Sequence, residues 1–342
     1  MSKAGRSIIL GRCIASGLFV TAALLACLSS LSGSSSAQPA RRSTDWQPGD
    51  YTQTLYFDGL TRTYLLHLPT AYTTSQELPL IIVLHGGGGN ADNISTTTGM
   101  SGEADRRSFI VVYPEGTGAI STWDAVHCCG YALANNIDDV GFIRALIQTL
   151  TATLAIDSHR IYAAGFSNGA MLTYRLGADL SDVLAAIAPV AGTIGGQATD
   201  ASPTVTIRVP DRPMPIIAFH GRLDQNVLYD GGHGTATSGT RVDLAVSQSI
   251  TFWVQHNGCA PTPQSSVSAS ANITTETYTH CRNQTDVILY TIGNQGHAWP
   301  GGQAGPLGDD PTHEITATSL IYDFFMQHPR LDQSIFLPLV QR

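Results

Sequence analysis

Residues 160–169, RIYAAGFSNG, join two segments of different character. The first half is a short apolar run typical of a buried β-strand, and the residues after Ser167 continue with helical spacing. A G-x-S-x-G sequence between a strand and a helix allows a sharp turn that holds the serine hydroxyl above the edge of a sheet. This stretch therefore predicts a nucleophilic serine, Ser167.

Short apolar runs and helical stretches alternate along the chain on both sides of this turn. The sequence predicts buried strands at residues 78–84, 109–113, 160–164, 185–190 and 215–220. It predicts helices at 138–154, 168–180, 242–256 and 315–327, strands near 274–278 and 287–292, and an N-terminal β-hairpin formed by 51–57 and 63–68. The alternation predicts an α/β fold, in which a mostly parallel sheet carries helices on both faces, as one domain over residues 51–329.

A serine nucleophile requires a histidine base and an acidic residue that orients the base. Asp224 follows the predicted strand 215–220 after a short turn, which makes it the candidate acid. His297 comes soon after the strand at 287–292, and the glycine before it allows a close approach to Ser167. Both residues follow Ser167 in the chain order that this turn motif requires. We therefore expect Ser167, Asp224 and His297 to form a catalytic triad, with His220 as a structural support of the loop that carries Asp224.

A glycine-rich loop, His85-Gly86-Gly87-Gly88-Gly89-Asn90, follows the first buried strand. Consecutive glycines let backbone N–H groups point into a site without obstruction by side chains. We expect an oxyanion hole formed by the N–H groups of Gly87 and of Asn168, the residue after the nucleophile.

Other polar and aromatic residues near the expected site can be interpreted as functional or as structural. Trp123 and Trp299 are candidates for substrate contact, with burial as the alternative. The loops 119–136 and 231–241 are expected to line the substrate pocket. Asp138-Asp139 resembles an acid–base pair, but its position at a predicted helix start indicates a structural cap.

Residues 1–37 have the features of an export signal. Lys3, Arg6 and Arg12 precede an apolar run, and small residues end at Ala37. This pattern predicts a signal peptide at 1–37, a linker at 38–50 and a C-terminal tail at 330–342, and hence a secreted protein. A membrane anchor, a periplasmic location and a lipid anchor at Cys27 are the alternatives.

The charged residues exclude several kinds of chemistry. The net charge of −8 disfavours nucleic acids and anionic membranes as partners, because both require a basic surface. Lys3 is the only lysine, so a chain without its leader lacks a Schiff-base lysine, a Ser-Lys dyad and a phosphate-loop lysine. An acidic surface favours neutral esters or neutral polymers as substrates.

Four cysteines lie beyond the predicted leader: Cys128, Cys129, Cys259 and Cys281. We favour a disulfide between Cys259 and Cys281, and the partners of Cys128 and Cys129 stay open. No Cys-x-x-Cys pair is present, so no metal site is expected.

As a set, the motifs along residues 50–329 resemble the polyhydroxybutyrate depolymerase family of secreted esterases, which is related to feruloyl and acetylxylan esterases. The motifs are Leu84 to Gly89, Trp123 with Cys128-Cys129-Gly130, Asp138 to Phe142, Gly165 to Gly169, His220-Gly221 with Asp224, and Gly296 to Gly301. The resemblance implies an α/β-hydrolase fold and a Ser-His-Asp triad at Ser167, His297 and Asp224. Ser-Asn-Gly in the turn is closer to the feruloyl-esterase-like branch, and the sequence has no recognisable substrate-binding domain.

The sequence thus predicts a secreted serine carboxylesterase that acts through an acyl-enzyme and needs no cofactor. Candidate substrates are small esters, hydroxybutyrate oligomers and the feruloyl or acetyl esters of plant polysaccharides. Acyl transfer by the same triad and non-catalytic binding of a carbohydrate or polymer are the alternatives.

Overall fold

The computed structural model describes residues 46–237, 239–305 and 308–331. The predicted export signal with Cys27, most of the linker and nearly all of the tail lie outside these described residues. Regular structure begins at Gly49, within the predicted linker, and its last helix ends at Gln327. No helix among the described residues is long and apolar enough to cross a membrane.

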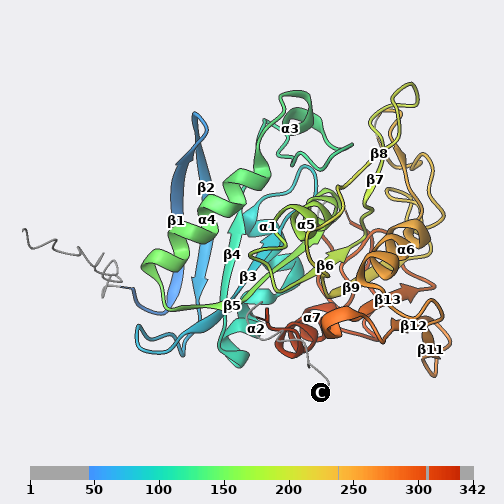
Figure 1. Ribbon diagram of the computed structural model, residues 1–342. Helices are drawn as coiled ribbons and strands as arrows, with labels where there is room; N and C mark the ends of the chain where they lie inside the picture. Colours follow the sequence, from blue (N-terminus) through green and yellow to red (C-terminus); the bar gives the residue numbers. More distant parts are fainter. Residues whose placement is uncertain (1–45, 238, 306–307, 332–342) are drawn as a thin grey trace, which may run out of the picture. The chain divides into compact units, whose positions relative to one another are not determined.

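A ten-stranded sheet forms the centre of the fold (Figure 1). Its strands, in spatial order, are β1 (Gly49–Phe57), β2 (Leu60–Leu68), β4 (Ile110–Pro114), β3 (Leu78–Leu84), β5 (Ile156–Phe166), β6 (Ala186–Val190), β9 (Ile216–Gly221), β13 (Val287–Ile292), β12 (Ile273–Tyr278) and β11 (Gln264–Val267). The strands from β4 to β13 pair in parallel. The two strands at each edge pair antiparallel.

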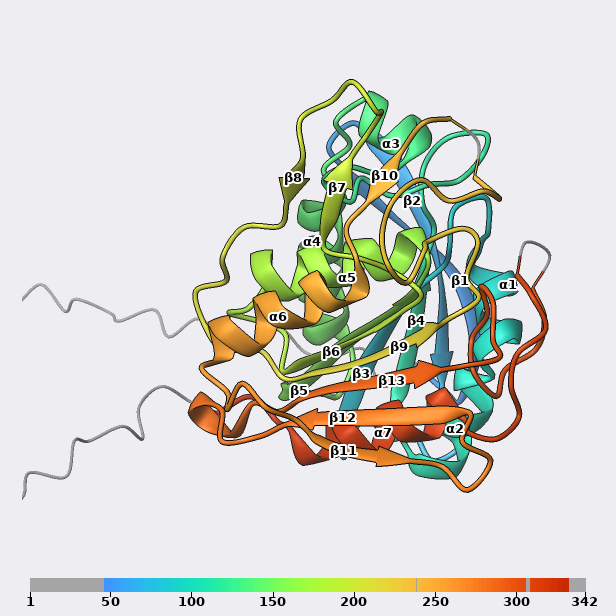
Figure 2. The same cartoon turned by 90° about the vertical axis from the view of Figure 1, so that its right-hand side faces the viewer.

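Helices cover both faces of this sheet (Figure 2). One face carries α4 (Asp139–Thr153), α5 (Asn168–Asp179) and α6 (Val246–Asn257), and the other carries α1 (Ala91–Thr98), α2 (Met100–Arg107) and α7 (Ala317–Gln327). Strand β3 serves both cores, because successive side chains of a strand point to opposite faces. Ile82 and Leu84 pack in the first core, whereas Ile81 and Val83 pack in the second.

The structure confirms the predicted α/β architecture and the N-terminal hairpin. Strands β1 and β2 pair from Phe57 and Leu60 outward, around the two-residue turn Asp58-Gly59. Both turn residues have positive φ angles, 47° and 77°, which matches the twist of the flanking strands. The predicted strands and main helices are present, with boundaries that differ by a few residues.

The structure also contains elements that the sequence pattern did not indicate. These are helices α1, α2 and α3 (Gly130–Ala134), the edge strand β11, and a small separate sheet of β10 (Val242–Asp243), β7 (Gly195–Gln197) and β8 (Val205–Thr206). Helix α1 contains three consecutive threonines and only one large apolar residue, Ile94. Its capping residue Asn90 accepts a hydrogen bond from the N–H of Asn93 at 2.7 Å, and burial of Ile94 holds it against the sheet.

Candidate active site

Ser167 lies in the sharp turn between β5 and α5. Its backbone angles are φ 56° and ψ −120°, a region that non-glycine residues rarely adopt. The N–H of Ser167 donates to the carbonyl of Val190 on β6 at 2.9 Å, and its own carbonyl accepts from Met171 at 3.0 Å. The neighbouring strand and the first turn of the helix therefore hold the backbone of Ser167 in this strained conformation.

The two glycines of the turn are required by close backbone contacts. A Cβ atom on Gly165 would overlap the carbonyl oxygen of Gly169. A Cβ atom on Gly169 would lie only 2.5 Å from the carbonyl oxygens of Leu84 and His85. Gly165 thus lets α5 fold back closely on the end of β5, and Gly169 lets the start of α5 approach the end of β3, which places Ser167 beside the glycine-rich loop.

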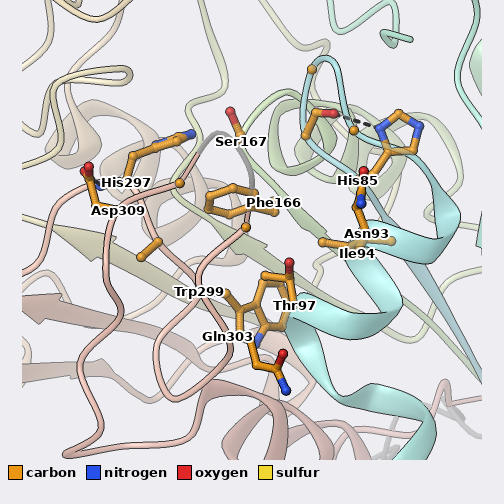
Figure 3. A pocket seen from close by; sticks show the side chains of 16 residues that line it. His85, Asn93, Ile94, Thr97, Phe166, Ser167, His297, Trp299, Gln303 and Asp309 are labelled. Atoms are coloured by element: carbon orange, nitrogen blue, oxygen red, sulfur yellow. Dashed lines mark hydrogen bonds between the residues drawn. The ribbon is translucent and has the colours of Figure 1, made fainter.

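The structure brings the predicted acid and base into contact. Asp224 follows the end of β9 and His297 follows the end of β13, and parallel neighbouring strands end at the same edge of the sheet. The imidazole Nδ1 of His297 lies 2.7 Å from Oδ2 of Asp224, and both side chains are buried. When Nδ1 donates to this carboxylate, Nε2 of a neutral imidazole is free to accept a proton. His297 and Ser167 line the same cavity (Figure 3).

The environment of Asp224 keeps its carboxyl group ionised. Burial alone would raise its pKa, but the hydrogen bond and charge of His297, together with the hydrogen bond from the N–H of Val227, outweigh burial, and the pKa lies below its usual value. Oδ1 accepts the N–H groups of Asn226 and Val227 at 2.8 and 2.9 Å. The predicted support, His220, contacts the carbonyl of Val227 at 2.8 Å through Nε2. Burial lowers the pKa of His220, which favours its neutral form.

A second carboxylate, Asp309, fixes the backbone of His297. The N–H of His297 donates to Oδ2 of Asp309 at 2.6 Å, and the N–H of Asp309 donates to the carbonyl of His297 at 2.9 Å. A Cβ atom on Gly296 would overlap this carboxylate, which explains the glycine before the histidine. The sequence did not indicate this role of Asp309. Gly296 was the one residue whose lack of a side chain hinted at a close contact with the backbone before His297.

The two predicted oxyanion donors lie next to each other. A Cβ atom on Gly87 would be 3.8 Å from the Cβ of Asn168, and one on Gly86 would be 3.2 Å from the Cβ of Ser167. The N–H groups of Gly88 and Gly89 are occupied by the carbonyls of Ser121 and Gly86, at 2.7 and 3.0 Å. Asn168 is the first residue of α5, where backbone N–H groups have no partner within the helix.

The cavity beside Ser167 is lined by the glycine-rich loop, α1 and the segment after His297 (Figure 3). Phe166 packs against the imidazole of His297, with ring centroids 4.7 Å apart. Ile94 and Trp299 add apolar surface, and Thr97 and Gln303 add polar groups. Among the described residues that line the cavity there is no arginine, and the one carboxylate is Asp309.

The remaining sequence-based candidates take structural positions. Both tryptophans are buried, with Trp299 1% exposed and Trp123 fully covered. Trp299 still forms part of the cavity wall, whereas Trp123 is not among the described lining residues, so burial is the alternative that fits Trp123. The loops 119–136 and 231–241 were expected to line the pocket, but none of their described residues line the cavity. Asp138 caps α4 by accepting the N–H of Gly141 at 2.8 Å, as expected for a structural cap. Asp139 forms a buried ion pair with Arg62.

The four described cysteines form two pairs. Cys259, after α6, is joined to Cys281, after β12. The structure also pairs Cys128 with the adjacent Cys129, whose partners the sequence left open. Among the residues that the structure describes, no group of three His, Cys, Asp or Glu side chains could hold a metal ion.

Comparison with known proteins shows which families and enzymes this chain is similar to. Residues 62–227 match the family described as esterase PHB depolymerase. Feruloyl esterase B of Piromyces equi is 30% identical over 247 residues, which cover 71% of this chain and 44% of that protein. Feruloyl esterase C of Emericella nidulans is 27% identical over 74% of this chain and 83% of that protein. The chain thus spans less than half the length of the first relative.

The fold has solved counterparts as well. The acetyl xylan esterase of Aspergillus awamori superimposes with a TM-score of 0.52 at 15% sequence identity, over 73% of this chain and 94% of that one. This likeness confirms the α/β-hydrolase fold. The family match confirms the resemblance drawn from the motifs.

Proposed function

We propose that this chain, which carries a domain of the esterase PHB depolymerase family, is a serine carboxylesterase. The observation that supports it most is the hydrogen bond of 2.7 Å between His297 and Asp224 beside the strained turn of Ser167. Esterases among its relatives point to the same chemistry.

The proposed reaction proceeds through an acyl-enzyme. His297 takes the proton of the Ser167 hydroxyl through Nε2, while Asp224 holds Nδ1 and stabilises the imidazolium. The serine oxygen attacks the ester carbonyl, and the N–H groups of Gly87 and Asn168 stabilise the negative oxygen that forms. His297 then gives its proton to the departing alcohol, and water releases the acid by the reverse sequence.

We propose that the group entering the cavity is uncharged. Phe166, Ile94 and Trp299 provide apolar surface, and Asp309 would repel an anionic substituent at close range. Thr97 and Gln303 can hydrogen-bond polar substituents. Feruloyl, acetyl and hydroxybutyryl groups are all uncharged, so methyl ferulate, acetylated xylan and hydroxybutyrate oligomers form a suitable panel. We also propose that residues 1–37 direct export of the protein.

Replacement of the nucleophile tests the proposed function. Ser167→Ala should lower kcat for p-nitrophenyl butyrate by several powers of ten, on the order of 10⁶-fold, because the acyl-enzyme can no longer form. The wild-type protein should also react stoichiometrically with a fluorophosphonate, and the variant should not. A folded Ser167→Ala protein with wild-type hydrolysis would disprove the assignment.

A further inference from the structure

Trp123 connects the two segments that carry the proposed oxyanion donors. It is fully buried, and its indole and its backbone form hydrogen bonds in two different directions. We propose that Trp123 is a positioning residue that sets the spacing between the N–H groups of Gly87 and Asn168. This inference rests on the proposed esterase function.

The indole holds the glycine-rich loop. Its Nε1–H donates to the carbonyl of His85 at 2.9 Å, two residues before Gly87. The imidazole of His85 lies against the indole, with ring centroids 4.9 Å apart. The two ring nitrogens of this imidazole connect the loop to a neighbouring segment. Nδ1 contacts the Gly86 carbonyl at 2.7 Å, and Nε2 accepts the N–H of Gly116 at 3.0 Å.

The backbone of Trp123 holds the start of α5. Its N–H donates to Oδ1 of Asn168 at 2.8 Å, and its carbonyl accepts from Nδ2 of the same side chain at 3.1 Å. Both of these hydrogen bonds are buried. The amide of Asn168 is therefore engaged on both sides, which restrains the residue whose own N–H is the second proposed donor.

The two contacts together relate one donor segment to the other. The loop after β3 and the start of α5 belong to different elements, and Trp123 bonds to both from a third segment. Donors to an oxyanion are effective only when both lie at hydrogen-bond distance from the same oxygen. A displacement of about 1 Å can cost on the order of 100-fold in rate. Loss of the indole N–H should thus weaken oxyanion stabilisation while leaving Ser167 and His297 in place.

Trp123→Phe removes this N–H and keeps an aromatic side chain. The matched control is Trp253→Phe, because Trp253 is equally buried and its indole N–H has no hydrogen-bond partner among the described residues. The assay uses p-nitrophenyl butyrate as the substrate. The inhibitor is the trifluoromethyl ketone whose carbonyl carries the same propyl group as the butyryl group of the substrate. Ser167 adds to this ketone, its proton passes to His297, and the resulting hemiketal oxyanion occupies the same position as the oxyanion of the reaction.

For Trp123→Phe, we expect kcat/KM to fall and the inhibition constant of the ketone to rise in parallel, each by about 10- to 100-fold, with little change in KM. Trp253→Phe should change neither constant, although it lowers the melting temperature. A merely structural role would reduce the fraction of active enzyme but leave the inhibition constant of that fraction unchanged.

The proposal is wrong if folded Trp123→Phe binds the ketone as wild type does, or if both tryptophan variants weaken binding equally. If Trp123→Phe does not fold, Asn168→Ala decides, because it removes both amide contacts and keeps the backbone N–H. It must show the same parallel change. Wild-type protein that neither hydrolyses the ester nor binds the ketone would instead refute the esterase function.

Discussion

His85 shows how one buried side chain links the stability of the protein to pH. Its pKa is lowered to about 4, chiefly by burial and also by the charge of Arg62, although the hydrogen bond between Nδ1 and the Gly86 carbonyl raises it in part. The neutral ring is what the site uses, because Nε2 accepts the N–H of Gly116. A protonated ring could not accept this bond.

The sign of the pH effect follows from the two states of the chain. Below pH 6.5 the histidine of an unfolded chain binds a proton, whereas His85 in the folded protein stays neutral down to a pH of about 4. Its contribution to stability is thus complete above pH 6.5 and is lost as the pH falls toward 4, in total on the order of 3 kcal/mol.

His85→Gln should remove this contribution to the pH dependence. We expect the free energy of unfolding to fall less for the variant than for wild type between about pH 7 and pH 5, by roughly 2 kcal/mol. Urea unfolding of both proteins at the two pH values measures the difference, and the other titrating groups cancel in the comparison. Equal pH dependence of the two proteins would contradict the assignment of a neutral, buried His85.

The individual residues of the candidate site differ in how far the sequence revealed them. The sequence indicates Ser167, Asp224 and His297 as the candidate triad, because each follows a strand in a turn and the chain order restricts the choice. It did not indicate Asp309, because the contact of Asp309 with the His297 backbone depends on the path of a long irregular segment. Trp123 was identified, but no local pattern distinguishes an indole that supports a loop from one that contacts substrate.

At the scale of elements, the distance between β3 and α5 decides whether the turn at Ser167 can form. Gly169 permits this distance, because an added Cβ would meet backbone oxygens of Leu84 and His85 at 2.5 Å. Backbone atoms of a central strand cannot move aside as a flexible side chain can. Helix α5 would have to shift away from the sheet and take Ser167 with it.

Gly169→Ala should therefore lower both stability and activity. Overpacking of this kind costs about 1–3 kcal/mol, and displacement of the nucleophile should reduce kcat/KM by at least about 10-fold. Gly102→Ala is the matched control, since Gly102 is exposed in α2 and its added Cβ would meet only the end of the Arg106 side chain at 3.8 Å. The control should gain about 0.5–1 kcal/mol and keep full activity. Thermal unfolding and ester hydrolysis measure both effects, and equal behaviour of the two variants would refute the close-contact argument.

Elements with strong local periodicity were predictable, and elements held by tertiary contacts were not. The buried strands and α4, α5, α6 and α7 have apolar residues at regular spacing. Helix α1 has weak helix formers, and α2 is mostly polar, with Met100, Glu103 and Ala104 as its buried residues. Because α1 lines the cavity, this part of the candidate site was the part least visible in the sequence.

At the scale of the whole described domain, the candidate catalytic residues and the disulfide between Cys259 and Cys281 lie at opposite ends of the parallel strands. Ser167, Asp224 and His297 follow the carboxyl ends of parallel strands. Cys281 lies just beyond Tyr278, which pairs with Val287 at the start of β13. The disulfide thus joins the end of α6 to the edge of the sheet at which its parallel strands begin.

This separation predicts that the disulfide supports stability without tuning the site. The bond closes a loop with a sequence separation of 22 residues, for which chain entropy gives a contribution of about 3 kcal/mol. The double variant Cys259→Ala with Cys281→Ala should lose about that much free energy of unfolding, yet keep kcat and KM within about twofold while it is folded, because none of the site contacts involves the lost bond. Urea unfolding and assays well below the unfolding transition measure the two quantities separately. A large loss of kcat in folded variant protein would show that the two ends of the sheet are coupled. An unchanged free energy of unfolding would show that α6 and β12 stay in place without the disulfide.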